Sequence, residues 1–177
     1  GANSNVAVGV HALGSLTSGD CNVAIGAQAG EANTSGSYNT TIGYQSGHVL
    51  ADGNSNVLIG RGTGIAMTSQ DEMVLIGNDA GAAINNDAAD GTIAIGYAAG
   101  SSITSGARNI AVGYNAGLGL VDSSDCTLIG YMAGEDMDSL GSAPQECTYI
   151  GSYAGRYLDD GSLNTAVGHG AMEGGTS

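Results

Sequence analysis

The sequence predicts an all-β protein, a parallel β-roll or β-solenoid of ten coils with about 17 residues each. Three observations support this fold class. A short kernel recurs along the whole chain, and apolar residues and glycines fall in fixed columns of that repeat. The third is composition: the 177 residues include 32 glycines and neither tryptophan nor phenylalanine. Such a chain cannot fill a core with large rings, so it must pack small residues at close spacing.

The repeat is centred on a glycine that ends a short apolar run. Residues 22–26 read Asn-Val-Ala-Ile-Gly, and Ala29-Gly30 follow two residues later. The central glycines recur at steps of 17 residues in seven of nine intervals, and the other two steps are 19 and 21. Residues 1–177 are therefore predicted to form a single solenoid domain. The ten structural glycines are Gly9, Gly26, Gly43, Gly60, Gly77, Gly96, Gly113, Gly130, Gly151 and Gly168.

Each column of the repeat predicts a part of the coil. The residue before the central glycine is always Ile or Val, which predicts a strand with these side chains facing the roll interior. Alanine at the third position after the glycine indicates a column that cannot accept bulk. Glycine at the fourth predicts a bend with positive φ or close backbone approach. A second apolar column, seven residues after the central glycine, predicts a second inward-pointing strand. Polar turns such as residues 34–36 join the strands, and no helix is expected.

The residue two positions before the central glycine predicts an oligomer. This column includes Ala24, Leu58 and Tyr149, so both faces of the kernel strand are largely apolar. A strand that is apolar on both faces is normally buried on both. Because so thin a roll has one interior, we expect the second face to pack against another copy of the chain. An isolated solenoid with one flat apolar face is the alternative.

The kernels resemble two kinds of fibrous protein. Residues 42–47, Ile-Gly-Tyr-Gln-Ser-Gly, and 95–100, Ile-Gly-Tyr-Ala-Ala-Gly, are similar to the head repeats of YadA-like trimeric autotransporter adhesins. They are equally similar to repeats of phage and virus tail fibres, whose kernel is seen at residues 164–168. The resemblance covers nearly the whole chain. The repeat here is longer than the adhesin repeat, which implies longer outer loops.

The resemblance carries expectations about assembly and function. It implies a homotrimer of left-handed parallel β-rolls with the kernel strand inside, located extracellularly on a bacterial surface or a virion tail fibre. The implied function is display and binding of a host or other surface. Because the repeat pattern begins and ends without a capping segment, we also expect a fragment of a longer fibre.

Charge narrows the range of partners. The chain has 17 acidic residues and three arginines but no lysine, for a formal net charge of −14. Nucleic-acid binding requires clustered cations and is not expected. No apolar run is long enough to span a bilayer, so no direct membrane insertion is expected. Calcium binding by the acidic turns is the alternative to solvated charge, but no known calcium-loop pattern is present. We predict no metal and no cofactor.

No catalytic residues are predicted. His11, His48 and His169 fall in three different columns, which argues against a triad or a metal cluster within one chain. Two other functions remain open beside the fibre. One is a single-chain solenoid with an ice- or surface-binding flat face. The other is a trimeric tailspike-like enzyme that degrades polysaccharides.

One tyrosine column is the candidate recognition surface. Tyr97, Tyr114 and Tyr131 directly follow the central glycine in three successive coils. Aligned rings suit contact with a receptor such as a host-surface glycan or protein. The alternative is a ladder that stabilises neighbouring coils by cross-strand packing.

A further column, four residues before the central glycine, predicts an amide ladder. Asparagine fills it in six coils, while Cys126 and Cys147 fill it in two adjacent ones. In-register cysteines on neighbouring strands lie within disulfide range. Cysteine is also a small residue that is often buried, and free thiols are the favoured interpretation.

Overall fold

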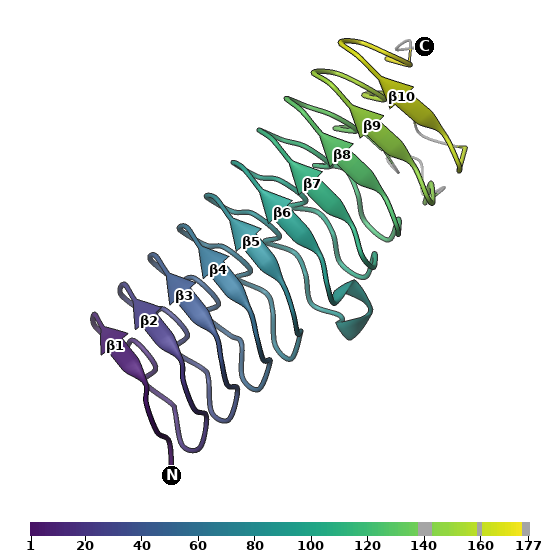
Figure 1. Cartoon of the computed structure of the whole chain (residues 1–177). Helices are drawn as coiled ribbons and strands as arrows, with labels where there is room; N and C mark the ends of the chain where they lie inside the picture. Colours follow the sequence, from purple (N-terminus) through teal and green to yellow (C-terminus); the bar gives the residue numbers. More distant parts are fainter. Residues whose placement is uncertain (138–142, 159–160, 175–177) are drawn as a thin grey trace.

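The chain forms a parallel β-solenoid in the computed structural model, which describes residues 1–137, 143–158 and 161–174. Ten strands form a single sheet in sequence order, each parallel to the next. Figure 1 shows them side by side along the stack, with the N-terminus at one end and the C-terminus at the other. The strands are β1 (Val6–Val8), β2 (Val23–Ile25), β3 (Thr40–Ile42), β4 (Val57–Ile59), β5 (Val74–Ile76), β6 (Ile93–Ile95), β7 (Ile110–Val112), β8 (Thr127–Ile129), β9 (Thr148–Ile150) and β10 (Thr165–Val167).

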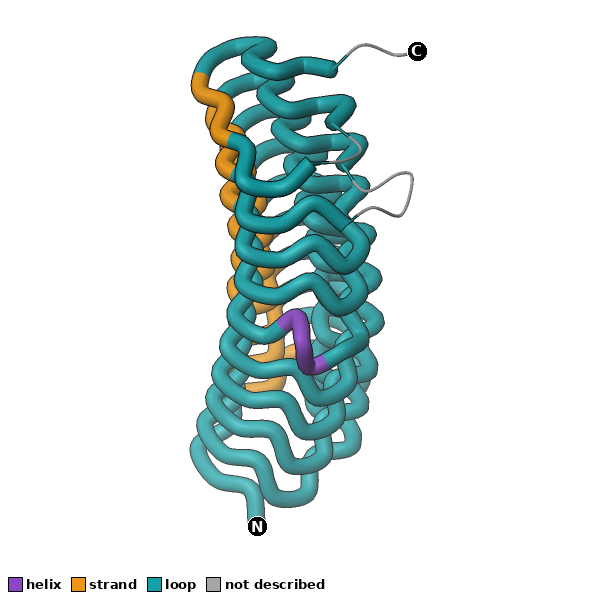
Figure 2. The backbone as a smooth tube through the Cα atoms, turned by 90° about the vertical axis from the view of Figure 1, so that its right-hand side faces the viewer, coloured by secondary structure: helices purple, strands orange, loops and turns teal. Residues whose placement is uncertain are grey.

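The strands stay in register through both longer repeats. Val74 of β5 pairs with Ile93 of β6 across the 19-residue step, and Thr127 of β8 pairs with Thr148 of β9 across the 21-residue step. The extra residues are therefore accommodated outside the sheet. In the first case they form a 3-10 helix, η1 (Asp87–Ala89), drawn purple in Figure 2. The expectation of no helix was wrong here, because two added residues give the loop enough length for one tight turn.

The second longer repeat, between Gly130 and Gly151, has four extra residues, which fall around Leu140 to Glu146. Part of it, residues 138–142, lies outside the described residues, as do residues 159–160 of a predicted acidic turn. Its remainder rejoins the stack before β9, where Pro144 is buried.

The core is formed by three columns. The middle residue of the strand, the alanine column three residues after the central glycine, and the second apolar column are buried along most of the stack. They pack as one long cluster from Leu50 to Ala166, with a smaller cluster around Leu13 at the N-terminal end. Fully buried members include Leu50, Leu58, Met67, Leu75, Ala80, Ile84, Ala99, Ile103, Ala116, Leu120, Leu128, Ala133, Met137 and Tyr149.

The predicted inward direction of the Ile and Val column was wrong. Ala24 and Leu128, in the middle of their strands, are completely buried, whereas Ile25 and Ile129 are 39% and 37% exposed. The column assigned to a partner chain thus fills the roll, and the Ile and Val side chains face outward. Both faces of the strand are apolar, so hydrophobic alternation could not distinguish them. The direction in which the chain bends after the glycine decides which face is enclosed.

The prediction of a second strand in each coil was also wrong. The second apolar column is buried as expected, but its residues lie in turns, and each coil contributes one strand to the sheet. The reason is a pair of left-handed residues that interrupt extended backbone, for example Gln45 (φ 56°) and Gly47 (φ 56°). The predicted bend at the fourth position is confirmed, and even Leu13, which replaces glycine there, has a φ of 50°.

The central glycines are required by backbone conformation and by space. Gly43 has a φ of +128°, and a Cβ added to it would lie 2.5 Å from the carbonyl oxygen of Gly60 in the next coil. Its neighbours in the column have similar φ values and similarly close coil-to-coil approaches. No side chain fits between coils at this column in the first nine copies, and at Gly168, which no coil follows, the φ of +127° alone favours glycine.

Candidate interaction surfaces

The predicted tyrosine column forms a continuous stack of rings. The centroids of Tyr97 and Tyr114 are 5.2 Å apart with an interplanar angle of 11°, and those of Tyr114 and Tyr131 are 5.4 Å apart at 14°. Tyr153 continues the row with an edge-to-face contact to Tyr131 at 5.3 Å. These separations are typical of aromatic pairs that overlap only partly. The packing ladder is therefore real, whereas the receptor role stays a prediction.

The row is also open to solvent. Tyr97, Tyr114 and Tyr131 are 49%, 44% and 43% exposed. Packing against Tyr153 and its neighbours removes water from the Tyr131 phenol and raises its pKa. The hydroxyl therefore stays protonated and can donate a hydrogen bond over the whole neutral pH range. Sequence reasoning missed Tyr153 as part of the row because it lies one column away, at the second position after the glycine.

The outward face of the sheet is a second exposed surface. Two positions on each strand point outward, and the twenty side chains there are Val, Ile or Thr, without a charged residue. All are at least partly exposed, and Val8 and Val167 reach 57% and 67%. Figure 2 shows the strands aligned along one side of the stack. An apolar strip of this length is unusual on a single folded chain.

The cations of the chain are all paired with carboxylates of neighbouring coils. The arginine nitrogen lies 3.6 Å from the carboxylate in Arg61–Asp79, 2.6 Å in Arg108–Asp125 and 2.7 Å in Arg156–Glu135. The Arg156 guanidinium also lies over the rings of Tyr153 and Tyr157, at 5.0 and 4.6 Å from their centroids. The remaining surface charge is therefore negative. Nothing in this arrangement resembles a phosphate-binding surface.

The asparagine column forms the expected ladder, mainly through backbone groups. The Oδ1 of Asn39 accepts hydrogen bonds from the backbone N–H and the Nδ2 of Asn56, both at 3.0 Å. Its Nδ2 donates to the carbonyl of Gly53 in the next coil at 2.6 Å. Asn22 makes the same two kinds of contact with the coil that follows it. Asn22, Asn39, Asn56 and Asn109 are buried, so each of these amides satisfies backbone groups that water cannot reach.

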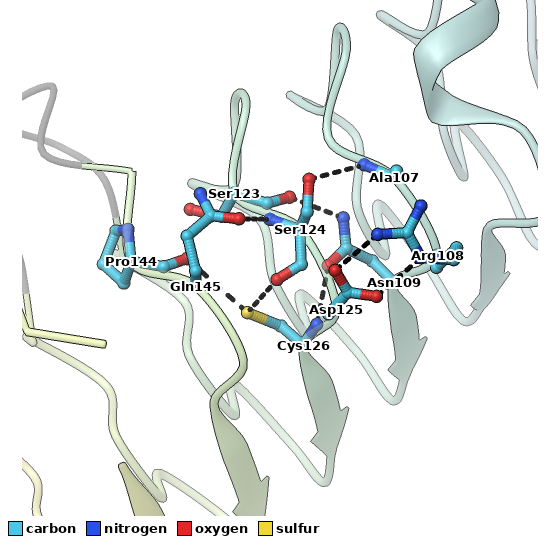
Figure 3. Close-up of polar contacts among 9 residues, drawn as sticks. All are labelled: Ala107, Arg108, Asn109, Ser123, Ser124, Asp125, Cys126, Pro144 and Gln145. Carbon is cyan, nitrogen blue, oxygen red and sulfur yellow. Dashed lines mark hydrogen bonds and ion pairs between the residues drawn. The ribbon is translucent and has the colours of Figure 1, made fainter. Parts of the chain in front are cut away.

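A second ladder, two residues earlier, was missed by sequence reasoning. In Figure 3 the N–H of Ala107 donates to the Ser124 Oγ at 2.9 Å, and the N–H of Ser124 donates to the Gln145 Oε1 at 2.8 Å. Ala107 has no acceptor, and the preceding Asp90 N–H bonds to the Asp87 carbonyl of η1 instead. The signal was available, since nine of the ten residues in this column have a side chain that can accept a hydrogen bond.

The two cysteines of the asparagine column are free thiols, as favoured by the sequence. The Cys126 N–H donates to the Asn109 Oδ1 at 3.0 Å, and the Sγ lies 3.6 Å from the carbonyl oxygen of Pro144 (Figure 3). The thiol therefore occupies the place where asparagine puts its amide. Burial raises the pKa of Cys126 to about 11, so the thiol is protonated and unreactive at neutral pH.

Within the parts of the chain that the structure describes, no three His, Cys, Asp or Glu side chains gather in a geometry that could hold a metal ion. His11, His48 and His169 do not come together; the Nδ1 of His48 lies 3.5 Å from the Oε2 of Glu31, and His169 contacts Tyr153 edge to face. No helix among the described residues has the length and hydropathy needed to cross a bilayer.

The fold and surfaces define the class of protein: a parallel β-solenoid with about 17 residues per turn and one exposed apolar sheet face. Comparisons with protein-family models, with curated proteins and with solved structures found no match.

Proposed function

We propose that this chain is a structural and attachment module of a homotrimeric fibre that displays a binding surface outside the cell, on a bacterium or on a virion tail. The observation that carries this proposal is the outward face of the sheet, with its twenty uncharged Val, Ile and Thr side chains. A standard protein–protein interface takes about 20–30 residues from each partner.

A second copy of the chain is the occupant that fits this face best. Its outward side chains recur with the same coil spacing, so two faces can align coil by coil along their whole length. The face carries no charge, whereas the rest of a chain with a net charge of −14 would repel a copy. The number three comes from the resemblance of the kernel to trimeric adhesin heads and tail fibres.

Molar mass in solution tests the assembly. A value near three times the single-chain 17.3 kDa supports the proposal, and a value of 17.3 kDa contradicts it. Ile59→Asp puts a charge on β4, within the apolar face, and is expected to give a folded monomer. The matched control is Val49→Asp, which replaces a 36% exposed side chain in a loop away from the sheet and should leave the oligomer intact.

The same sample separates the other two functions. Thermal hysteresis, a gap between the freezing and melting temperatures of ice in a solution of the monomer, would favour the ice-binding face. Thr127, Thr148 and Thr165 follow one another on that face in three coils. Release of reducing ends from a polysaccharide would favour a degrading spike. The fibre proposal expects neither activity.

A further inference from the structure

We propose that the tyrosine row formed by Tyr97, Tyr114 and Tyr131 binds an extended β-1,4-linked glycan that runs parallel to the solenoid axis, with one sugar residue beside each coil. This inference names a ligand for the proposed attachment function and rests on that function.

The first support is the geometry of the rings. The stacked centroids repeat at 5.2 and 5.4 Å, close to the length of one residue in a fully extended β-1,4-linked chain. The three tyrosines are 49%, 44% and 43% exposed, so each keeps part of its ring in solvent. A sugar can place its axial C–H groups against the uncovered ring and exchange a hydrogen bond with the phenol. The match in spacing lets this contact recur without bending the glycan.

The second support is the charge around the row. In coils six to eight, the residues from one position before the central glycine to two positions after it carry no charge. They are residues 95–98, 112–115 and 129–132. The preceding coil breaks this pattern with Asp79, and the coil before that with Arg61. These windows carry no charged side chain, and the Glu135 carboxylate beside them, which accepts a hydrogen bond from Asn115, is paired with Arg156. Such a strip on a chain with a net charge of −14 suits an uncharged polymer and disfavours an anionic one.

Polymer geometry sets the choice among neutral glycans. Cellulose and chitin chains are flat and extended and keep a constant rise per residue, so both fit the row. Amylose has α-1,4 linkages and coils, which takes successive residues away from a straight line of rings. The inference therefore covers the β-1,4-linked class, and experiment distinguishes its two members.

The experiment measures retention of the full chain on chitin, cellulose and amylose beads. We expect retention on chitin, cellulose or both, and none above background on amylose. Replacing Tyr97, Tyr114 and Tyr131 together by Ala should weaken binding about tenfold or more, because it removes all three ring contacts at once. Tyr114→Ala alone, which interrupts the row at its centre, should show a smaller loss.

Tyr44→Ala is the matched control. Tyr44 occupies the same column and is 51% exposed, but its neighbours in the column, Ala27 and Arg61, are not aromatic. Its replacement should leave retention unchanged. Equal retention on amylose and on the β-1,4-linked beads, or an equal loss for Tyr44→Ala and Tyr114→Ala, would overturn the inference.

A second measurement needs no variant. Titration of the wild-type chain with cellohexaose or chitohexaose should change the near-ultraviolet circular dichroism of the stacked tyrosines, and maltohexaose should not. No change with either β-1,4-linked hexamer contradicts the proposal even where the triple variant fails to fold. Molar mass recorded on the same sample separates the two proposals, because a trimer that binds no glycan overturns the ligand and leaves the fibre intact.

Discussion

The buried asparagines connect side-chain chemistry directly to coil stacking. Each satisfies backbone groups of the next coil, which no solvent reaches. Replacing such a residue lowers the free energy of unfolding in two ways. Its own hydrogen bonds are lost, and the backbone groups that it paired are left buried without a partner. The ladder therefore stabilises the contact between neighbouring coils, and its effect is local to them.

Asn39→Ala should lower the free energy of unfolding by about 2–4 kcal/mol, because it removes the acceptor for the Asn56 N–H and the donor to the Gly53 carbonyl. Urea denaturation followed by circular dichroism measures the change. The control is Asn78→Ala, whose amide donates to the adjacent Asp79 carboxylate and which should cost less than about 0.5 kcal/mol. Equal losses at the two sites would contradict the role of the ladder.

Cys126 gives a prediction about pH. The folded state raises the pKa of this thiol to about 11 from its ordinary value of 9.0. Above pH 9 the unfolded chain therefore loses the Cys126 proton more readily than the folded one, and stability falls as pH rises towards 11. Cys126→Asn restores the amide of the column and should remove this part of the alkaline loss. The measurement is the difference between variant and wild type in unfolding midpoint from pH 7 to pH 11.

Tyr149 also has a raised pKa, first through burial, and destabilises both proteins at alkaline pH. Cys126 is itself one of the causes of that shift, so the difference between variant and wild type also includes any change in the titration of Tyr149. A difference that stays constant from pH 7 to pH 11 would show that Cys126 does not titrate as proposed.

The coil as an element depends on left-handed backbone at fixed places. Three positive-φ residues follow each strand, beginning with the central glycine, and a fourth precedes it, for example Ser55 at φ 60° before β4. These positions differ in the residue types that they accept. The central glycine must be glycine, whereas many other left-handed positions hold ordinary residues, so the fold accepts the smaller strain where there is room for a side chain.

Gly43→Ala and Gly91→Ala form a matched test of this difference. An added Cβ at Gly43 meets the Gly60 carbonyl oxygen at 2.5 Å, whereas at Gly91 (φ +75°) nothing lies within 4 Å. We expect a loss of about 3 kcal/mol or more at Gly43, and about 1 kcal/mol at Gly91 from left-handed strain alone. Thermal unfolding measures both, and a smaller loss at Gly43 than at Gly91 would contradict the argument.

For the whole molecule, charge opposes compaction. The three arginines form ion pairs with neighbouring coils, and the other acidic residues leave a strong negative field. The Arg61–Asp79 and Arg108–Asp125 pairs are largely exposed and contribute little, and the more buried Arg156–Glu135 pair is screened less by salt, so the loss of ion pairing in salt is small. Repulsion summed over the acidic residues is the larger effect.

The midpoint of thermal unfolding should therefore rise as potassium chloride increases from about 0.01 M to about 1 M, over which the Debye length falls from about 30 Å to about 3 Å. A double variant, Glu72→Gln with Glu146→Gln, removes two exposed charges and should show a smaller rise. Chain concentration is kept constant, since assembly also shifts the midpoint. A midpoint that falls with salt would show that the ion pairs outweigh the repulsion.

The sequence by itself determined the repeat, the ten strands and their parallel register, the glycine bends, the asparagine ladder and the tyrosine row. Each of these features depends on interactions between equivalent positions one repeat apart. Residues in the same column of the repeat are therefore predicted to be neighbours in the structure. The same comparison would have predicted the second ladder, because nine of the ten residues in its column have a side chain that can accept a hydrogen bond.

Only the tertiary structure decided which apolar face of the strand encloses the core and that the second apolar column is not a strand. Ala24 and Ile25 are both apolar, and alternation cannot tell inside from outside when neither face is polar. Which face is enclosed depends on where the backbone bends after the glycine. The residue type does not reveal this bend, because ordinary residues such as Gln45 adopt the left-handed conformation there. That bend leaves the Ile and Val face outward, where a partner chain can reach it.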